Sequence, residues 1–171
     1  KYRETGKIKF NSHYKNPPEG DLSVDSVTGT AMLIDRDKLK LINDWDTNIF
    51  NYFEDMDLCL RFRLKGFEII KIRNAEVDHD AFSSHDKNFS QKMDFSRNWH
   101  HSWSRFYFLK KHTTKINAYK YGLNFFIKSI FKSIFYIFFK KSKAITHFAK
   151  AYGTLFSILN LQPTYRPKIK T

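Results

Sequence analysis

Three acidic side chains lie close together in the middle of the chain, at Glu54, Asp55 and Asp57. A carboxylate within hydrogen-bond reach of a hydroxyl group can take up its proton while that hydroxyl attacks an electrophile. Arg61 follows Asp57 by four residues, a spacing at which opposite charges pair along a helix. The plainer interpretation is that the acids only stabilise a helix N-terminus, where negative charge is favourable. These residues alone leave both interpretations open.

Two features in this region could hold a metal ion. Asp55 and Asp57 have the letters of an Asp-x-Asp motif. Two residues apart on a helix, however, they point about 200° apart, so we do not expect them to clamp one ion. His79 lies in a loop between Asp78 and Asp80, and imidazole is a common metal ligand. A lone histidine in a loop is more often solvated, so His79 needs a further argument.

The elements that must position these residues follow from the pattern around them. A helix is predicted over residues 53–65, because acids occupy its first turns, basic residues its last turns, and Gly66 follows as a stop. A short helix is expected over residues 35–42. The apolar run at residues 31–34 predicts a strand buried on both faces, and residues 67–72 predict another strand.

The order of these features resembles the second half of a family 2 glycosyltransferase, most of all its rhamnosyltransferase-like members. The resemblance covers about residues 24–112. It depends on several separate elements in the family's order: the strand with Gly29, then Trp45-Asp46, Phe50-Asn51-Tyr52, Glu54-Asp55-Met56-Asp57-Leu58-Cys59-Leu60-Arg61, Gly66 and His79.

The resemblance implies an α/β fold. Residues 1–112 would be the C-terminal, acceptor-side half of a GT-A (Rossmann-like) glycosyltransferase domain, and residues 113–171 a basic amphipathic helical extension. The implied reaction is inverting transfer of a sugar from a nucleotide-sugar donor to a saccharide acceptor, which we expect to be lipid-linked, in bacterial surface polysaccharide synthesis. In this family the donor pocket belongs to the first half of the domain, so we expect activity to need an N-terminal half as well.

The resemblance also implies roles for single residues. Asp55 would be the catalytic base, and His79 would help to hold Mg²⁺ or Mn²⁺ beside the donor diphosphate. The substrate-binding positions would be Gly29, Thr30, Trp45, Asp46, Glu54, Asp57 and Arg61, with Arg61 holding Asp57. Three positions depart from the family: Trp45 replaces the usual Phe, Thr47 replaces a common acid, and Phe53 replaces a small residue.

The charge of the chain is concentrated at one end. The 171 residues contain 30 Lys and Arg against 17 Asp and Glu, for a net charge of +13. All of this excess lies in residues 106–171, which contain no Asp or Glu. A hydrophobic content of 42% excludes disorder over most of the chain, and the single cysteine, Cys59, excludes a disulfide framework. The basic end is therefore expected to face something anionic.

A helix with one apolar half is predicted from Tyr121 onward. At about 100° per residue, one half carries Lys, Ser and Tyr, and the other carries Leu123, Phe126, Ile127, Ile130, Phe131, Ile134, Phe135, Ile137 and Phe138. Lysines interrupt the stretch, so the pattern favours a helix lying in a membrane surface over one that spans it.

Residues 97–112 are rich in aromatic and basic side chains. They could stack nucleic-acid bases, pack into a core, or sit at a bilayer surface; we favour packing beside a membrane edge. The expected partners are a nucleotide sugar, a saccharide or lipid-linked acceptor and an anionic membrane, with no nucleic acid. The expected location is cytoplasmic, peripheral on the inner face of the cell membrane. The alternative is a non-enzymatic basic module that binds a membrane surface or nucleic acid.

Overall fold

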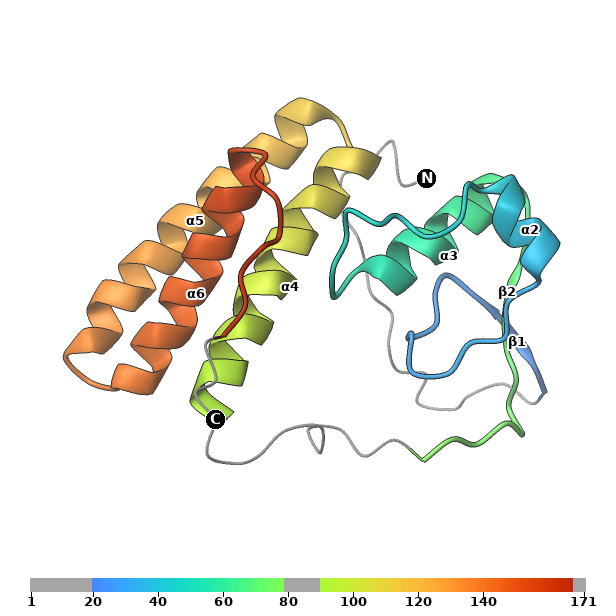
Figure 1. Ribbon diagram of the computed structural model, residues 1–171, viewed down its shortest axis with the longest axis horizontal. Coiled ribbons are helices and arrows are strands. Elements are labelled where there is room, and N and C mark those ends of the chain that lie inside the picture. The colour runs from blue at the N-terminus through green and yellow to red at the C-terminus, as the bar shows by residue number, and fades with distance from the viewer. Residues whose placement is uncertain (1–19, 79–89, 168–171) are drawn as a thin grey trace. The chain divides into compact units, whose positions relative to one another are not determined.

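The computed structural model describes residues 20–78 and 90–167 of the chain. Its elements are, in order, β1 (Leu22–Val24), α2 (Arg36–Leu41), α3 (Glu54–Leu64), β2 (Ile69–Lys71), α4 (Ser90–His112), α5 (Lys115–Ile137) and α6 (Lys141–Ile158) (Figure 1). Their described residues form two compact units. We call residues 20–47 and 54–78 the mixed unit, and residues 48–53 and 90–167 the helical unit.

The expected α/β fold of the GT-A type is wrong for the described residues. Of these, 59% are helical and 4% are in strands, and the only sheet among them has two strands. That sheet is antiparallel, with Ser23 opposite Ile70. A Rossmann-like domain needs several parallel strands covered by crossover helices. The apolar residues here are instead used mainly to pack helices. The proposed division of roles between residues 1–112 and 113–171 stays a prediction.

The mixed unit is built on α3. The predicted helix over residues 53–65 is confirmed as Glu54–Leu64, and the short helix over residues 35–42 is confirmed as α2. Asp35 caps α2, because its side chain accepts hydrogen bonds from the backbone N–H groups of Asp37 and Lys38. The core of this unit consists of Ile42, Leu58 and Phe62, with half-buried apolar side chains around them.

The two strands differ from those expected. Residues 31–34 form no strand, and the side chain of Leu33 is 100% exposed. A strand buried on both faces needs neighbours on both sides, and no strand described here pairs with residues 31–34. Met32 and Ile34 are instead half-buried and pack against the core of the mixed unit. The predicted strand over residues 67–72 does form, but only at Ile69–Lys71, where it pairs with β1.

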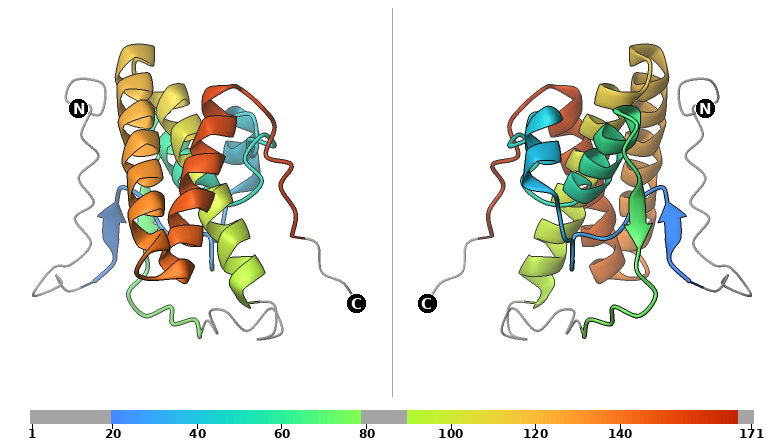
Figure 2. Two further views of the ribbon diagram at one scale, coloured as in Figure 1. Left: turned by 90° about the vertical axis from the view of Figure 1, so that its left-hand side faces the viewer. Right: turned by 90° about the vertical axis from the view of Figure 1, so that its right-hand side faces the viewer.

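The helical unit is held together by α6, which packs against both α4 and α5 (Figures 1 and 2). Trp99 and Trp103 of α4 are buried against Ala149 of α6, so the packing part of the prediction for residues 97–112 is confirmed. The membrane edge beside them stays a prediction. Gly153 allows α4 and α6 to approach closely, because a Cβ at this position would overlap the carbonyl group of Trp99.

In the described part of the chain, no helix is long and apolar enough to cross a membrane.

Candidate active site

The side chain of Asp55 is held at the start of α3 by two backbone groups. The N–H of Gly29 donates to Oδ2 (2.8 Å), and the N–H of Met56 donates to Oδ1 (2.7 Å). Gly29 lies in a turn of the mixed unit, so residues 26 positions apart in sequence meet here. A carboxylate oxygen has two lone pairs. Each oxygen of Asp55 can therefore accept a further hydrogen bond, such as one from a hydroxyl group.

The neighbouring carboxyl of Glu54 lies in a different environment. Its Oε2 is buried and has no hydrogen-bond partner among the described residues. Burial raises the pKa of Glu54, and the negative charge of Asp55 raises it further. The two adjacent acids thus differ in hydrogen bonding. Asp55 accepts from two backbone N–H groups, whereas Glu54 has a buried oxygen without a partner among the described residues.

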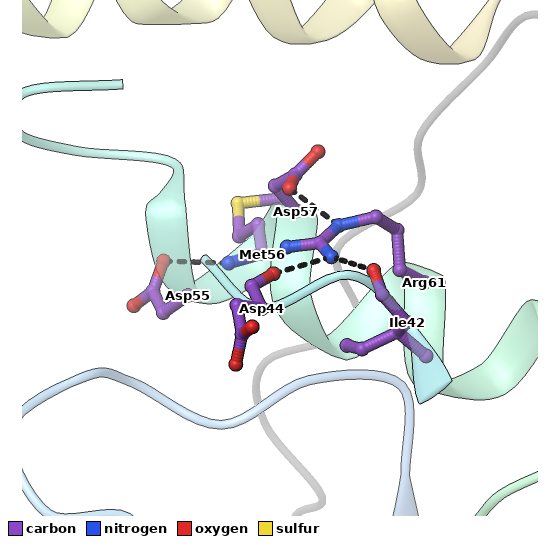
Figure 3. Close-up of polar contacts among 6 residues, drawn as sticks. All are labelled: Ile42, Asp44, Asp55, Met56, Asp57 and Arg61. Carbon is purple, nitrogen blue, oxygen red and sulfur yellow. Dashed lines mark hydrogen bonds and ion pairs between the residues drawn. The ribbon is translucent and has the colours of Figure 1, made fainter. Parts of the chain in front are cut away.

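The predicted pair of Asp57 and Arg61 is present and is mostly buried. Nε of Arg61 lies 2.8 Å from Oδ2 of Asp57, and the two side chains are 16% and 1% exposed. Nη1 of Arg61 also donates to the backbone carbonyl oxygens of Ile42 (2.5 Å) and Asp44 (2.6 Å) (Figure 3). Arg61 therefore fastens the turn after α2 to α3. Asp57 lies inside the mixed unit and holds this arginine.

The backbone just before α3 adopts an uncommon conformation. Tyr52 and Phe53 have φ angles of 65° and 69°, in the left-handed region. Bulky residues rarely adopt this region, at a cost of about 1–3 kcal/mol each, and such strain is concentrated at functional sites. Phe53 is also the position at which the family more often has a small residue. The strain lies directly beside Glu54 and Asp55.

The remaining predicted site residues are spread over several loops. Thr30 follows Gly29 in the same turn and is exposed. Trp45 and Asp46 lie between α2 and α3, directly after the turn that Arg61 fastens; Trp45 is exposed and Asp46 is half-buried. His79 lies outside the described residues, so its predicted role stays a prediction.

A metal site is not assembled within residues 20–78 and 90–167. No three His, Cys, Asp or Glu side chains in these two ranges lie close enough together to share an ion. Asp57 forms an ion pair with Arg61. The expected Mg²⁺ or Mn²⁺ ion, which His79 would help to hold, therefore stays a prediction.

Sequence reasoning missed some of the groups that shape the site. The carbonyl oxygens of Ile42 and Asp44 carry no signal in the sequence, because every residue has one. The left-handed backbone of Tyr52 and Phe53 also has no signal in the sequence, apart from the departure at Phe53, where a large residue replaces a small one.

Comparison of the chain with protein-family models, with curated proteins and with solved structures found no match.

Proposed function

We propose that this chain is the acceptor-activating part of an inverting glycosyltransferase, in which Asp55 is the catalytic base. The observation that carries the proposal is the geometry of Asp55. Its carboxylate is oriented by the N–H groups of Gly29 and Met56, and both of its oxygens keep the capacity to accept a further hydrogen bond. A side chain that only capped its own helix would not need Gly29.

The proposed reaction assigns one proton transfer to this carboxylate. The acceptor hydroxyl oxygen attacks the anomeric carbon of the donor sugar, and the bond from that carbon to the diphosphate oxygen breaks. The diphosphate leaves with the electron pair of that bond, and the hydroxyl proton moves to Asp55. A positioned base of this kind contributes about 10²–10⁴-fold to turnover. Attack from the side opposite the leaving group inverts the anomeric centre.

The other side chains have positioning roles in this proposal. Arg61 and Asp57 fix α3 against the turn at residues 42–44, which leads to Trp45 and Asp46. Glu54, whose pKa is raised by burial, lies next to Asp55 at the start of α3. Thr30 and Trp45 are exposed beside these elements and could contact the sugar.

The proposal also covers the substrates of the protein and its location in the cell. The donor pocket would come from an N-terminal part of the complete gene product, and the acceptor would be a lipid-linked saccharide. The protein would then act in the cytoplasm, peripherally at the inner face of the cell membrane, in surface polysaccharide synthesis. A divalent ion held with the help of His79 belongs to the same expectation. Substitution of His79 by Ala should raise the Mg²⁺ or Mn²⁺ concentration needed for activity.

The experiment is a transfer assay on the complete gene product. A panel of nucleotide sugars is offered with membrane lipid extract as acceptor, and the anomeric configuration of the product is read by NMR. Transfer with inversion supports the proposal. Retention of configuration, or no consumption of any nucleotide sugar by a folded protein, contradicts it.

The second candidate function is a basic binding module without catalysis. The observation in its favour is that residues 106–171 have 13 basic side chains and no acidic one. A module of this kind gives no reason for the hydrogen bond between Gly29 and Asp55 or for the buried Arg61. It would bind its anionic partner without consuming any nucleotide sugar, so the same transfer assay separates the two functions.

A further inference from the structure

The helix α5 buries only small residues fully and leaves many of its large apolar residues exposed. Its buried positions, all small, are Ala118, Gly122, Ser129 and Ser133. Ser133 donates a hydrogen bond from Oγ to the carbonyl oxygen of Ala144 of α6 (3.0 Å). A Cβ at Gly122 would overlap the ring of Phe106 of α4. The polar and small half of this amphipathic helix is therefore the half that faces the protein.

The opposite half is what we call the outer face of α5. Phe131 is 69% exposed and Ile134 is 52% exposed. Phe131 lies nine residues after Gly122, which places it about 180° around the helix from the buried side. The outer face consists of Leu123, Ile127, Phe131, Ile134, Phe135 and Phe138, which are all exposed. Exposed apolar side chains gathered on one face of a helix in this way mark a candidate interaction site.

Basic side chains border the outer face on one side. Lys128 and Lys132 lie about 60° and 100° around the helix from Phe131, and both are exposed. Beyond them, the guanidinium of Arg105 of α4 lies over the rings of Tyr121 and Phe125 (4.8 and 5.3 Å to the ring centres). We call Lys128, Lys132 and Arg105, which lie beside the outer face, the cationic strip.

The cationic strip extends to α6 without any acid to neutralise it. Burial lowers the pKa of the half-buried Lys150, and the positive charges of Lys132 and Arg105 lower it further. No Asp or Glu occurs from Phe106 to the end of the sequence. An anion bound here would relieve the repulsion among these groups.

Among the possible occupants of this surface, a second copy of the chain would bring lysines against lysines, which is unfavourable. Nucleic acid would use the positive charge but would leave the Ile and Phe side chains in water. An anionic lipid bilayer uses both, since its interface takes apolar side chains and its headgroups carry the negative charge.

We propose that the outer face of α5 lies in the surface of an anionic bilayer, with the helix parallel to the membrane plane. Its apolar side chains enter the interface, and Lys128, Lys132, Arg105 and Lys150 meet the headgroup phosphates. This docking does not depend on the proposed sugar transfer.

The test is co-sedimentation of the chain with vesicles of phosphatidylcholine, with and without phosphatidylglycerol. Salt is raised from about 0.1 M to about 1 M, which shortens the Debye length from about 10 Å to about 3 Å. We expect the chain to bind the anionic vesicles. Salt should weaken this binding without abolishing it, because screening does not affect the burial of the apolar side chains in the bilayer interface. Binding to phosphatidylcholine alone should be at least tenfold weaker.

Two sets of variants separate the contribution of the apolar side chains to vesicle binding from the contribution of the positive charges. The double substitution Phe131→Asp with Ile134→Asp should abolish vesicle binding. The matched control, Leu41→Asp with Leu64→Asp, changes two exposed apolar helical positions of the mixed unit and should bind like the parent chain. Lys128→Gln with Lys132→Gln should weaken binding at low salt about tenfold, whereas Lys65→Gln with Lys71→Gln should not. Circular dichroism confirms that each variant is folded.

Several outcomes would overturn the docking proposal. These are no vesicle binding, normal binding by a folded Phe131→Asp/Ile134→Asp variant, a dimer that this variant dissociates, or salt-steep nucleic-acid binding without vesicle binding. Asp55→Asn should bind vesicles normally, so a failure of the sugar-transfer proposal is distinguishable from a failure of docking.

Discussion

At the scale of single residues, the site is organised by backbone groups around charged side chains. Asp55 receives two N–H groups, and Arg61 donates to two carbonyl oxygens while pairing with the buried Asp57. A mostly buried charge that loses its partner is left uncompensated, and the free energy cost is large. Arg61 should therefore matter more for the stability of the mixed unit than an exposed arginine on the same helix.

The first prediction is that Arg61→Met lowers the free energy of unfolding by about 3–5 kcal/mol, because Asp57 stays buried without its partner. Asp57→Asn combined with Arg61→Met should cost less than the sum of the two single changes. The matched control is Arg63→Met, which removes an exposed pair with Asp25 and should cost less than about 1 kcal/mol. The measurement is urea unfolding, with hydrogen exchange of the α3 amides. Equal effects for Arg61 and Arg63 would contradict the buried-pair interpretation.

The buried histidine of the helical unit leads to a pH prediction. Burial, together with the charge of Arg166, lowers the pKa of His100, which lies 2.9 Å from the carbonyl oxygen of Tyr165 through Nε2. Below about pH 6.5 the unfolded chain binds a proton that the folded chain does not bind. Stability should therefore fall as the pH drops below about 6.5. Burial lowers the pKa values of His101 and His147 as well, so the effects add in the same direction.

Substitution of His100 by Gln, which cannot titrate, tests this assignment. Urea midpoints measured from about pH 7 to about pH 5 should decline less steeply in His100→Gln than in the parent chain. An unchanged slope would show that His100 is not the titrating group.

At the scale of helices and strands, the sequence predicted those elements whose signals are local. The acids and basic residues of α3, its stop at Gly66 and the Asp35 cap of α2 each act within a few residues, and both helices form where expected. The strand predicted at residues 31–34 failed because its stability depends on neighbouring strands, which a local apolar run does not specify. The packing face of α5 was missed for a related reason. Hydrophobicity marks the large residues, but close helix packing here uses Gly, Ala and Ser.

Gly153 provides the prediction at this scale. Alanine favours a helix over glycine by about 1 kcal/mol, so Gly153→Ala would stabilise α6 if propensity decided the outcome. A methyl group here would overlap the backbone of Trp99, which cannot rotate away, so we expect a net loss of about 1–3 kcal/mol. The control Asn124→Ala, at an exposed position of α5, should be neutral or slightly stabilising. Thermal unfolding measures both, and a stabilised Gly153→Ala would contradict the close packing of α4 and α6.

At the scale of the whole molecule, the net charge is unevenly distributed along the chain. Residues 1–105 contain every Asp and Glu together with an equal number of Lys and Arg, whereas the charged side chains of residues 106–171 are all basic. The candidate catalytic carboxylate belongs to the mixed unit and the outer face of α5 to the helical unit. We infer that the chain combines two tasks, acceptor activation and attachment to an anionic surface. The candidate site could be named from the sequence, because its acids and Arg61 are close together in the chain. The predicted α/β fold is wrong, because the two strands described here pair antiparallel and do not form the parallel sheet that this fold requires.

The central claim is that Asp55 takes the acceptor proton, and the most direct test is the single-turnover rate of Asp55→Asn in the complete gene product at saturating donor. The asparagine can still accept the hydrogen bond from Gly29 but cannot take up a proton. We predict a loss of about 10²–10⁴-fold in rate with donor affinity nearly unchanged. Asp37→Asn, which alters an exposed acid of α2, should keep the parent rate. A folded Asp55→Asn enzyme that turns over at a rate close to that of the parent would contradict the claim.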